Sequence, residues 1–337
     1  MLKHKICIAP MMDWSDRHCR FFWRLISKNV FLYTEMVTTG ALIHGDRQRF
    51  LQFNREETPV ALQLGGSQPK ELAQCANWAE QWGYNEVNLN CGCPSDRVQS
   101  GMFGACLMAK PELVADCVKA MQDSCDISVT VKHRIGIDDM ETYEQMLNFV
   151  DIIAATGCNT FIVHARKAWL QGLSPKQNRE IPPLNYDWVY RLKRERPELE
   201  IIINGGIDSL DSCEGHLQQV DGVMLGRSAY NNPYLLNDVD AQFFTASNNV
   251  AGRDDILLSY IPYIESQLSM GCYLNSMTRH VLGLYKKVPG AKIFRRHISQ
   301  NATKPGAGTE VLVDALELVK QARLEIEKND RILTITR

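Results

Sequence analysis

The sequence predicts an α/β fold, a (β/α)8 TIM barrel followed by a smaller all-helical domain, and two observations lead to this fold class. Short β-rich runs alternate with helical patterns eight times in about 240 of the 337 residues, which matches the size and order of such a barrel. Beyond that stretch, the chain shows only helical patterns. We therefore expect a barrel over residues 1–246 and a helical domain over residues 247–337, joined by a polar, glycine-containing stretch.

Each predicted strand is a short run that ends at a polar or glycine-bearing segment. The runs are KICIA (5–9), FLYTEM (31–36), VALQLG (60–65), NEVNLN (85–90), SVTVKHR (128–134), TFIVHA (160–165), EIIING (200–205) and DGVMLG (221–226). Helical patterns such as PKELAQCANWAEQWG lie between them. A doubly wound sheet is the alternative, but it rarely needs eight units, and no G-x-G-x-x-G follows the first run.

The predicted helical domain carries an uneven charge. Its patterns are ILLSYIPYIESQLSMG, SMTRHVLGLYKKV, AKIFRRHISQN and TEVLVDALELVKQARLEIEKND. Between Glu265 and Glu310 there is no acidic residue, and seven basic residues give this segment a charge of +7. Because the net charge of the chain is −2, the rest of the chain carries −9. A charged helix face is usually only solvated, yet the missing acids favour phosphate binding here.

Composition excludes several classes of protein. No apolar run approaches the ~18 residues of a membrane span, and the N-terminus lacks the features of a signal peptide. The eleven cysteines are odd in number and show no repeated spacing, so we expect reduced thiols and no metal site. The expectation is a cytoplasmic protein without membrane contact, acting as a monomer with no obligatory protein partner.

Polar residues stand where the predicted strands end. Because side chains alternate faces, strand parity points these residues into the barrel mouth, where this fold has its active site. They are Gln63, Asn90, Lys132, His164 and Asn204, with Met11, Met12 and Glu35 in the loops after the first two strands. One terminal polar residue is usually a cap, but so many together would need a polar ligand to satisfy them.

Glycine-bearing turns follow the seventh and eighth predicted strands. They are Asn204-Gly205-Gly206 and Gly226-Arg227, and we expect them to open helices and hold a phosphate. With Lys132 and Gln63 across the mouth, the chemistry suggests flavin mononucleotide (FMN) as the ligand.

Several motifs resemble those of the tRNA-dihydrouridine synthases. They are APMMDWSD, NLNCGCPSDRVQSGMFGACLM, TVKHRIG, NGGID and LGRSAYNNP, and HARKAWLQGLSPKQNREIPPLNY resembles the A-type bacterial branch. The resemblance implies reduction of the C5=C6 bond of uridine to dihydrouridine in the tRNA D-loop (uridines 20 and 20a), by FMN that NADPH re-reduces. The implied cofactor contacts are Pro10, Met11, Met12, Gln63, Lys132, His164, Asn204, Gly205, Gly206, Gly226 and Arg227.

The resemblance also implies that Cys93 is the catalytic acid. Hydride reaches uracil C6 from the flavin on one face of the ring, so C5 needs a proton from the other side. A thiol with a pKa near ~8.5 is mostly protonated at neutral pH and acidic enough to donate. We interpret Cys91 as the first, structural residue of the turn and Gly92 as the residue that permits the bend.

Two basic regions are candidate tRNA contacts. Lys176 and Arg179 lie in the long loop after the sixth strand, and Lys292 and Arg295 fall on one face of AKIFRRHISQN if that segment is helical. Asn90 is expected at the uracil edge or ribose. Two alternatives stay open, a flavin barrel acting on a free pyrimidine, such as a dihydroorotate oxidoreductase, and a non-enzymatic tRNA-binding protein.

Overall fold

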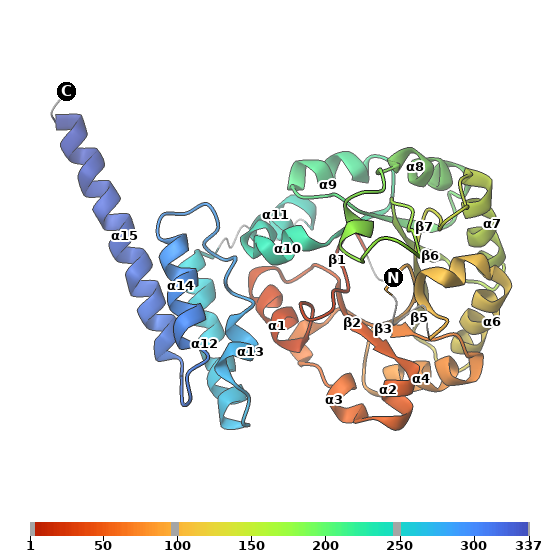
Figure 1. Ribbon diagram of the computed structural model, residues 1–337, viewed down its shortest axis with the longest axis horizontal. Coiled ribbons are helices and arrows are strands. Elements are labelled where there is room, and N and C mark those ends of the chain that lie inside the picture. The colour runs from red at the N-terminus through yellow and green to blue at the C-terminus, as the bar shows by residue number, and fades with distance from the viewer. Residues whose placement is uncertain (1–3, 96–100, 245–250, 336–337) are drawn as a thin grey trace. The chain divides into compact units, whose positions relative to one another are not determined.

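The protein was analysed as a computed structural model that describes residues 4–95, 101–244 and 251–335 (Figure 1). Contacts divide the chain into two compact units. The first contains residues 1–17 and 29–226, and the second contains residues 18–28 and 227–337. The predicted boundary between residues 246 and 247 lies outside the described residues and stays a prediction.

The first unit is built on one eight-stranded parallel sheet in the order β1-β8-β7-β6-β5-β4-β3-β2. A parallel bridge between Cys7 and Phe31 brings the edge strands together, with hydrogen bonds from Ile8 N to Phe31 O and from Phe31 N to Ile6 O, both 2.9 Å. The barrel prediction is confirmed. The strands are β1 (Ile6–Ile8), β2 (Leu32–Thr38), β3 (Val60–Gly65), β4 (Glu86–Cys91), β5 (Ser128–Arg134), β6 (Thr160–His164), β7 (Glu200–Asn204) and β8 (Gly222–Leu225).

Helices separate the strands, and local signals in the sequence explain where several of them begin. Two of them, α4 and α6, have proline in the first turn, and α7 has a capping box between Thr142 and Gln145. The helices and 3-10 turns of the first unit are α2 (Thr39–His44), α3 (Arg47–Leu51), η1 (Arg55–Glu57), α4 (Pro69–Gln81), η2 (Gly104–Ala109), α6 (Pro111–Gln122), α7 (Tyr143–Ala154), η3 (Gln177–Arg179), α8 (Tyr186–Glu195) and α9 (Leu210–Leu217).

The helix between β1 and β2, α1 (Arg17–Ile26), belongs by its contacts to the second unit. Phe21 stacks on Tyr263 with ring centroids 3.9 Å apart. His18 Nδ1 lies 2.7 Å from the Tyr263 hydroxyl, and the Tyr260 hydroxyl donates to the His18 carbonyl at 2.9 Å. The packing partners of this early helix are therefore encoded near the end of the chain.

The second unit otherwise consists of helices. They are α10 (Arg227–Asn231), η4 (Pro233–Asp238), α11 (Val239–Phe243), α12 (Arg253–Ser269), α13 (Leu274–Thr278), α14 (Ala291–Asn301) and α15 (Glu310–Ile335). The helix predicted over SMTRHVLGLYKKV is wrong beyond Thr278, where the chain continues in turns. These turns have hydrogen bonds three residues apart, such as Val281 N to Thr278 O and Leu284 N to Val281 O, and Lys287 has a positive φ, which an α-helix does not allow. Gly283 lies close to another backbone, since an added Cβ would stand 2.8 Å from the Asn231 carbonyl oxygen. No helix within the described ranges is long and apolar enough to cross a bilayer.

The barrel interior is layered as strand parity predicts. An apolar layer is buried at its centre, and its members are Cys7, Ala9, Phe31, Tyr33, Ala61, Ile162, Ile202 and Met224. Side chains two positions further along the same strands point into the mouth. Gln63 thus follows Ala61, His164 follows Ile162, and Asn204 follows Ile202.

A charged cluster lies at the floor of the barrel, where the strands begin. His4 Nε2 is 2.7 Å from Glu86 Oε2, and His4 Nδ1 is 3.0 Å from Glu200 Oε2. Burial opposes a charge on His4, but the two carboxylates outweigh it and raise the pKa of His4 to about 10. The floor therefore holds an imidazolium between two acids.

Candidate active site

A chain of hydrogen bonds runs through the barrel interior from the floor toward the mouth. The Thr130 hydroxyl donates to Glu86 Oε1 at 2.6 Å and accepts from Asn88 Nδ2 at 2.8 Å. Gln63 Nε2 donates to Asn88 Oδ1 at 2.8 Å, and Asn90 Nδ2 donates to Gln63 Oε1 at 2.8 Å. Each amide is thereby oriented by the one below it.

The last amide of this chain holds the turn after β4. Asn90 Oδ1 accepts from the backbone N–H of Gly92 at 3.0 Å and from that of Cys93 at 2.9 Å. Its side chain is buried, so it acts as a cap on the turn. The predicted contact of Asn90 with tRNA stays a prediction, and the structure adds a role that strand parity did not reveal.

Cys93 is half-buried at the start of the loop that follows β4. Its Sγ lies 3.5 Å from Ser95 Oγ, and its carbonyl accepts from the Ala105 N–H at 2.9 Å. The backbone N–H and carbonyl of Cys93 are therefore both anchored, and the residue is not fully buried.

The neighbouring Cys91 differs from the prediction in one respect. It is the last residue of β4, in register with His133, rather than the first residue of the turn. Burial, with the thiols of Cys117, Cys106 and Cys158 nearby, raises its pKa well above the usual range. A buried, protonated thiol fits the structural role assigned to Cys91.

The bend predicted from Gly92 has another cause. Gly92 does not have a positive φ, and a Cβ added to it would have its nearest atoms 3.6 Å away, an ordinary van der Waals contact. Another residue could therefore adopt this backbone. The turn is instead shaped by the Asn90 side chain, which binds two successive N–H groups.

Lys132 and Asn204 meet across the mouth. Lys132 Nζ donates to Asn204 Oδ1 at 3.2 Å, and Asn204 Nδ2 donates to the Met224 carbonyl at 2.7 Å. Burial and the charge of Arg134 lower the pKa of Lys132 to about 7, although Cys93 opposes this shift. Burial and the surrounding cations, Arg134 first, hold the pKa of His164 well below its usual range. Its ring is therefore neutral.

The two glycine turns differ in structure. Gly205 and Gly206 have positive φ, and a Cβ on either would stand 2.6 Å from a side-chain carbon of His164 or Leu184. Their turn does not open a helix directly, contrary to the prediction, because α9 begins only at Leu210. At Gly226 an added Cβ would meet no atom within 4 Å, and α10 begins at Arg227, the next residue.

The remaining predicted contacts differ in exposure. Pro10 is half-buried, Met11 packs on the apolar layer, and Met12 is 58% exposed. The basic residues predicted to contact tRNA are all exposed. Lys176 lies just before η3 and Arg179 is its last residue, both in the first unit.

The helix predicted over AKIFRRHISQN is confirmed as α14 in the second unit. Lys292 and Arg295 are exposed on it, whereas Phe294 and Ile298 are buried. Arg227 also belongs to the second unit, where it is half-buried.

Two residues of the site were missed by sequence reasoning. Arg134 is 3% exposed and donates to three backbone carbonyls, and Asn178 is fully buried within the loop after β6. Arg134 shares strand parity with Lys132, so parity could have found it. Nothing in the sequence distinguishes Asn178 from a solvent-exposed loop residue.

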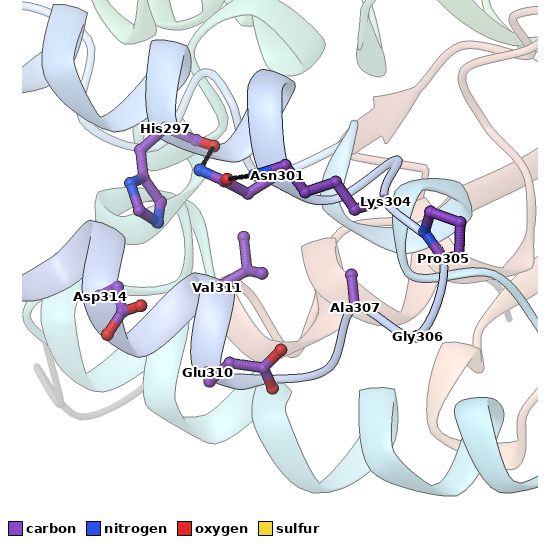
Figure 2. Close-up of a pocket in the computed structure, with 9 residues that line it drawn as sticks. All are labelled: His297, Asn301, Lys304, Pro305, Gly306, Ala307, Glu310, Val311 and Asp314. Carbon is purple, nitrogen blue, oxygen red and sulfur yellow. Dashed lines mark hydrogen bonds between the residues drawn. The ribbon is translucent and has the colours of Figure 1, made fainter.

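A hollow of about 310 Å³ lies elsewhere, in the second unit between α14 and α15 (Figure 2). None of the predicted site residues lines it. Its lining is His297, Asn301, Lys304, Pro305, Gly306, Ala307, Glu310, Val311 and Asp314.

Comparisons with known proteins find relatives that match most of the chain. The sequence model of the dihydrouridine synthase family matches residues 7–320. A relative from Vibrio parahaemolyticus, named tRNA-dihydrouridine(20/20a) synthase, is 58% identical over 313 residues, which cover 93% of this chain and 96% of the relative. A protein of the same name from Escherichia coli K12 is 58% identical over 320 residues, which cover 95% of this chain and 92% of the relative.

A solved structure supports the fold alone. An old yellow enzyme homologue from Zymomonas mobilis matches with a TM-score of 0.52 at 10% identity, covering 71% of this chain and 89% of that chain. The family predicted from the motifs is confirmed by the sequence matches, and the chain belongs to the dihydrouridine synthase family.

Proposed function

We propose that this protein reduces uridine to 5,6-dihydrouridine in the D-loop of tRNA, at uridines 20 and 20a, using FMN that is re-reduced by NADPH. The observation that carries the proposal is the half-buried Cys93 thiol, held at the barrel mouth by Asn90 in a chain of this family. The name of its relatives supports the choice of tRNA and of the two positions.

The residues around the mouth fit a flavin nucleotide. Lys132 Nζ, Gln63 Nε2 and Asn204 Nδ2 each use one N–H within the protein, and their other N–H groups could donate to polar ring edges. The open space at Gly226 would let a phosphate approach the backbone. The residues that would hold FMN are Pro10, Met11, Met12, Gln63, Lys132, His164, Asn204, Gly205, Gly206, Gly226 and Arg227. When bound in reduced form, the flavin supplies the hydride that reaches uracil C6.

Cys93 supplies the proton. The Sγ–H bond breaks as a C5–H bond forms on the uracil, which leaves a thiolate that regains a proton from water. Lys132, which lies within electrostatic range of Cys93, favours that thiolate while its own ammonium is charged. Asn90 keeps the peptide of Cys93 in place during the transfer.

Exposed cations would hold the RNA. A uridine within folded tRNA must leave its stack to reach the mouth, so the surrounding backbone needs firm contacts. We assign these contacts to Lys176, Arg179, Lys292 and Arg295, because all four are exposed. Asn90 can still offer the second N–H of its side-chain amide to the base, since its oxygen already accepts two backbone N–H groups.

The direct test uses tRNA from cells that lack this protein. The purified protein, loaded with FMN and given NADPH, should oxidise NADPH and form dihydrouridine at positions 20 and 20a, mapped by primer extension or mass spectrometry. A colourless protein that FMN does not reconstitute would refute the proposal. Turnover of free orotate without turnover of tRNA would establish a free pyrimidine as the substrate instead.

A further inference from the structure

Arg134 joins two loops of the barrel mouth through one guanidinium group. Its Nε donates to the Gly92 carbonyl at 2.9 Å, and its Nη1 donates to the carbonyls of Lys167 at 3.1 Å and Asn178 at 3.0 Å. All three acceptors are neutral backbone carbonyls. Within the described ranges, no carboxylate pairs with this arginine. A buried cation whose described partners are all neutral is costly, so these contacts are not explained by stability alone.

The two loops held by Arg134 carry different parts of the proposed reaction. Gly92 immediately precedes Cys93, whose N–H is bound by Asn90. On the other side, Asn178 fixes the backbone of Trp169, accepting from its N–H and donating to its carbonyl, both at 2.8 Å. Asn178 also lies within the loop that carries two of the proposed tRNA contacts, Lys176 and Arg179.

We propose that Arg134 is a positioning residue that locks the Cys93 turn to the loop of residues 166–185, so that the RNA-binding loop and the proton donor keep one relative geometry. The inference rests on the proposed function. The planar guanidinium directs several N–H groups at once and thereby reaches three carbonyls on two loops. A lysine ammonium at the same position is a compact charge and would not reach all three.

The charge of Arg134 adds to its positioning role. Burial lowers its pKa to about 10, with Cys93 opposing that shift and Arg179 and Arg166 adding to it. The value leaves the guanidinium charged at neutral pH. Because this charged group interacts electrostatically with Cys93, it favours the thiolate that remains after the proton has left.

The test compares Arg134→Met and Arg134→Lys with the matched control Arg196→Met. Arg196 forms an ion pair with Asp151, 2.5 Å away, at a site that contributes nothing to either loop. The first readout needs neither tRNA nor flavin. Iodoacetamide labelling of Cys93, followed by peptide mass spectrometry, should be about tenfold slower near pH 7.5 in Arg134→Met, because the variant lacks both the cation that favours the thiolate and the hydrogen bond to the Cys93 turn.

The second readout is steady-state turnover of tRNA by the FMN-loaded protein. In Arg134→Met we expect kcat to fall about 100-fold, with KM for tRNA and flavin reduction by NADPH within about threefold of the wild type. Arg134→Lys should restore the labelling profile but less than a tenth of kcat, because it keeps the charge and loses the fork. Arg196→Met should match the wild type in both readouts.

Two results would overturn the proposal. One is wild-type labelling and wild-type kcat in Arg134→Met, and the other, decisive if that variant does not fold, is wild-type kcat in Arg134→Lys. A wild-type protein that fails to reduce tRNA would refute the proposed function instead, while the labelling of Cys93 would still decide the role of Arg134.

Discussion

The floor and the mouth of the barrel both bury cations, but they treat them differently. At the floor, the His4 ring lies between the carboxylates of Glu86 and Glu200. At the mouth, Lys132 and Arg134 donate only to neutral oxygens in the described part of the chain. The floor thus pairs its cation with carboxylates, whereas the cations at the mouth have neutral partners among the described residues, which suits the anionic cofactor and the transient thiolate of the proposed function.

The largest effect expected at the mouth comes from Cys93→Ala. Removal of a general acid should lower the rate of uridine reduction by about 10²–10⁴-fold, while FMN content and tRNA affinity persist. Single-turnover formation of dihydrouridine measures this rate. The control is Cys91→Ala, which alters a buried thiol and should be mild in comparison. Equal losses in the two variants would contradict the division of roles between them.

The floor should respond in stability rather than in catalysis. In His4→Gln, two carboxylates lose their cation, which should cost about 3–5 kcal/mol of unfolding free energy in urea titrations near neutral pH. The matched control is His216→Gln, whose ring contacts the Tyr190 hydroxyl at 2.7 Å and carries a lowered pKa due to burial. A loss of the same size in both variants would argue against a special role for the charged floor.

The charged floor also predicts a pH dependence. The pKa of His4 is higher in the folded protein, about 10, than in the unfolded chain, about 6.5. Its contribution is therefore fully present below about pH 6.5 and is lost as pH rises toward 10. Urea titrations between pH 6 and pH 10 should show a decline in wild-type stability that is smaller in His4→Gln. Parallel pH profiles in the two proteins would exclude this linkage.

A smaller effect is expected from the lysine at the mouth. Lys132→Met should weaken FMN binding about 10–100-fold, measured by quenching of flavin fluorescence, because a charged hydrogen bond of about 1.5–3 kcal/mol is lost. In the wild type, FMN affinity should fall as pH rises above about 7, where Lys132 becomes neutral. Lys193→Met is the control, since Lys193 instead pairs with Asp221 at 2.7 Å. If FMN affinity changes neither with pH nor in Lys132→Met, the Lys132 ammonium does not contribute to flavin binding.

The smallest effect concerns exposed cations, which lack the low-dielectric surroundings of the mouth. Lys292→Ala combined with Arg295→Ala should weaken tRNA binding about tenfold at moderate salt. It should also reduce the slope of log K against log salt by about 2, one for each lost phosphate contact. Lys320→Ala, which removes an exposed lysine paired with Glu317, should leave the slope unchanged. An unchanged slope in the double variant would mean that this face of α14 is merely solvated.

Strand parity and motifs predicted much of the barrel but not the direction of its hydrogen bonds. Parity placed Gln63, His164 and Asn204 at the mouth because alternation is a property of the backbone. It could not show that the Asn90 oxygen binds two N–H groups of its own turn, since that depends on three-dimensional proximity. The same holds for Gly283, whose close approach to the Asn231 carbonyl joins residues that are far apart in the sequence.

The position of α1 has a consequence for synthesis of the chain. Its stacking partner Tyr263 follows His18 by 245 residues, so at about 5–20 residues per second the ribosome adds it at least about 12 s later. During that interval the aromatic face of α1 has no native surface to cover it. Gene truncations after the eighth strand would make that state permanent, and they should yield an aggregation-prone chain that depends on chaperones rather than an autonomous barrel.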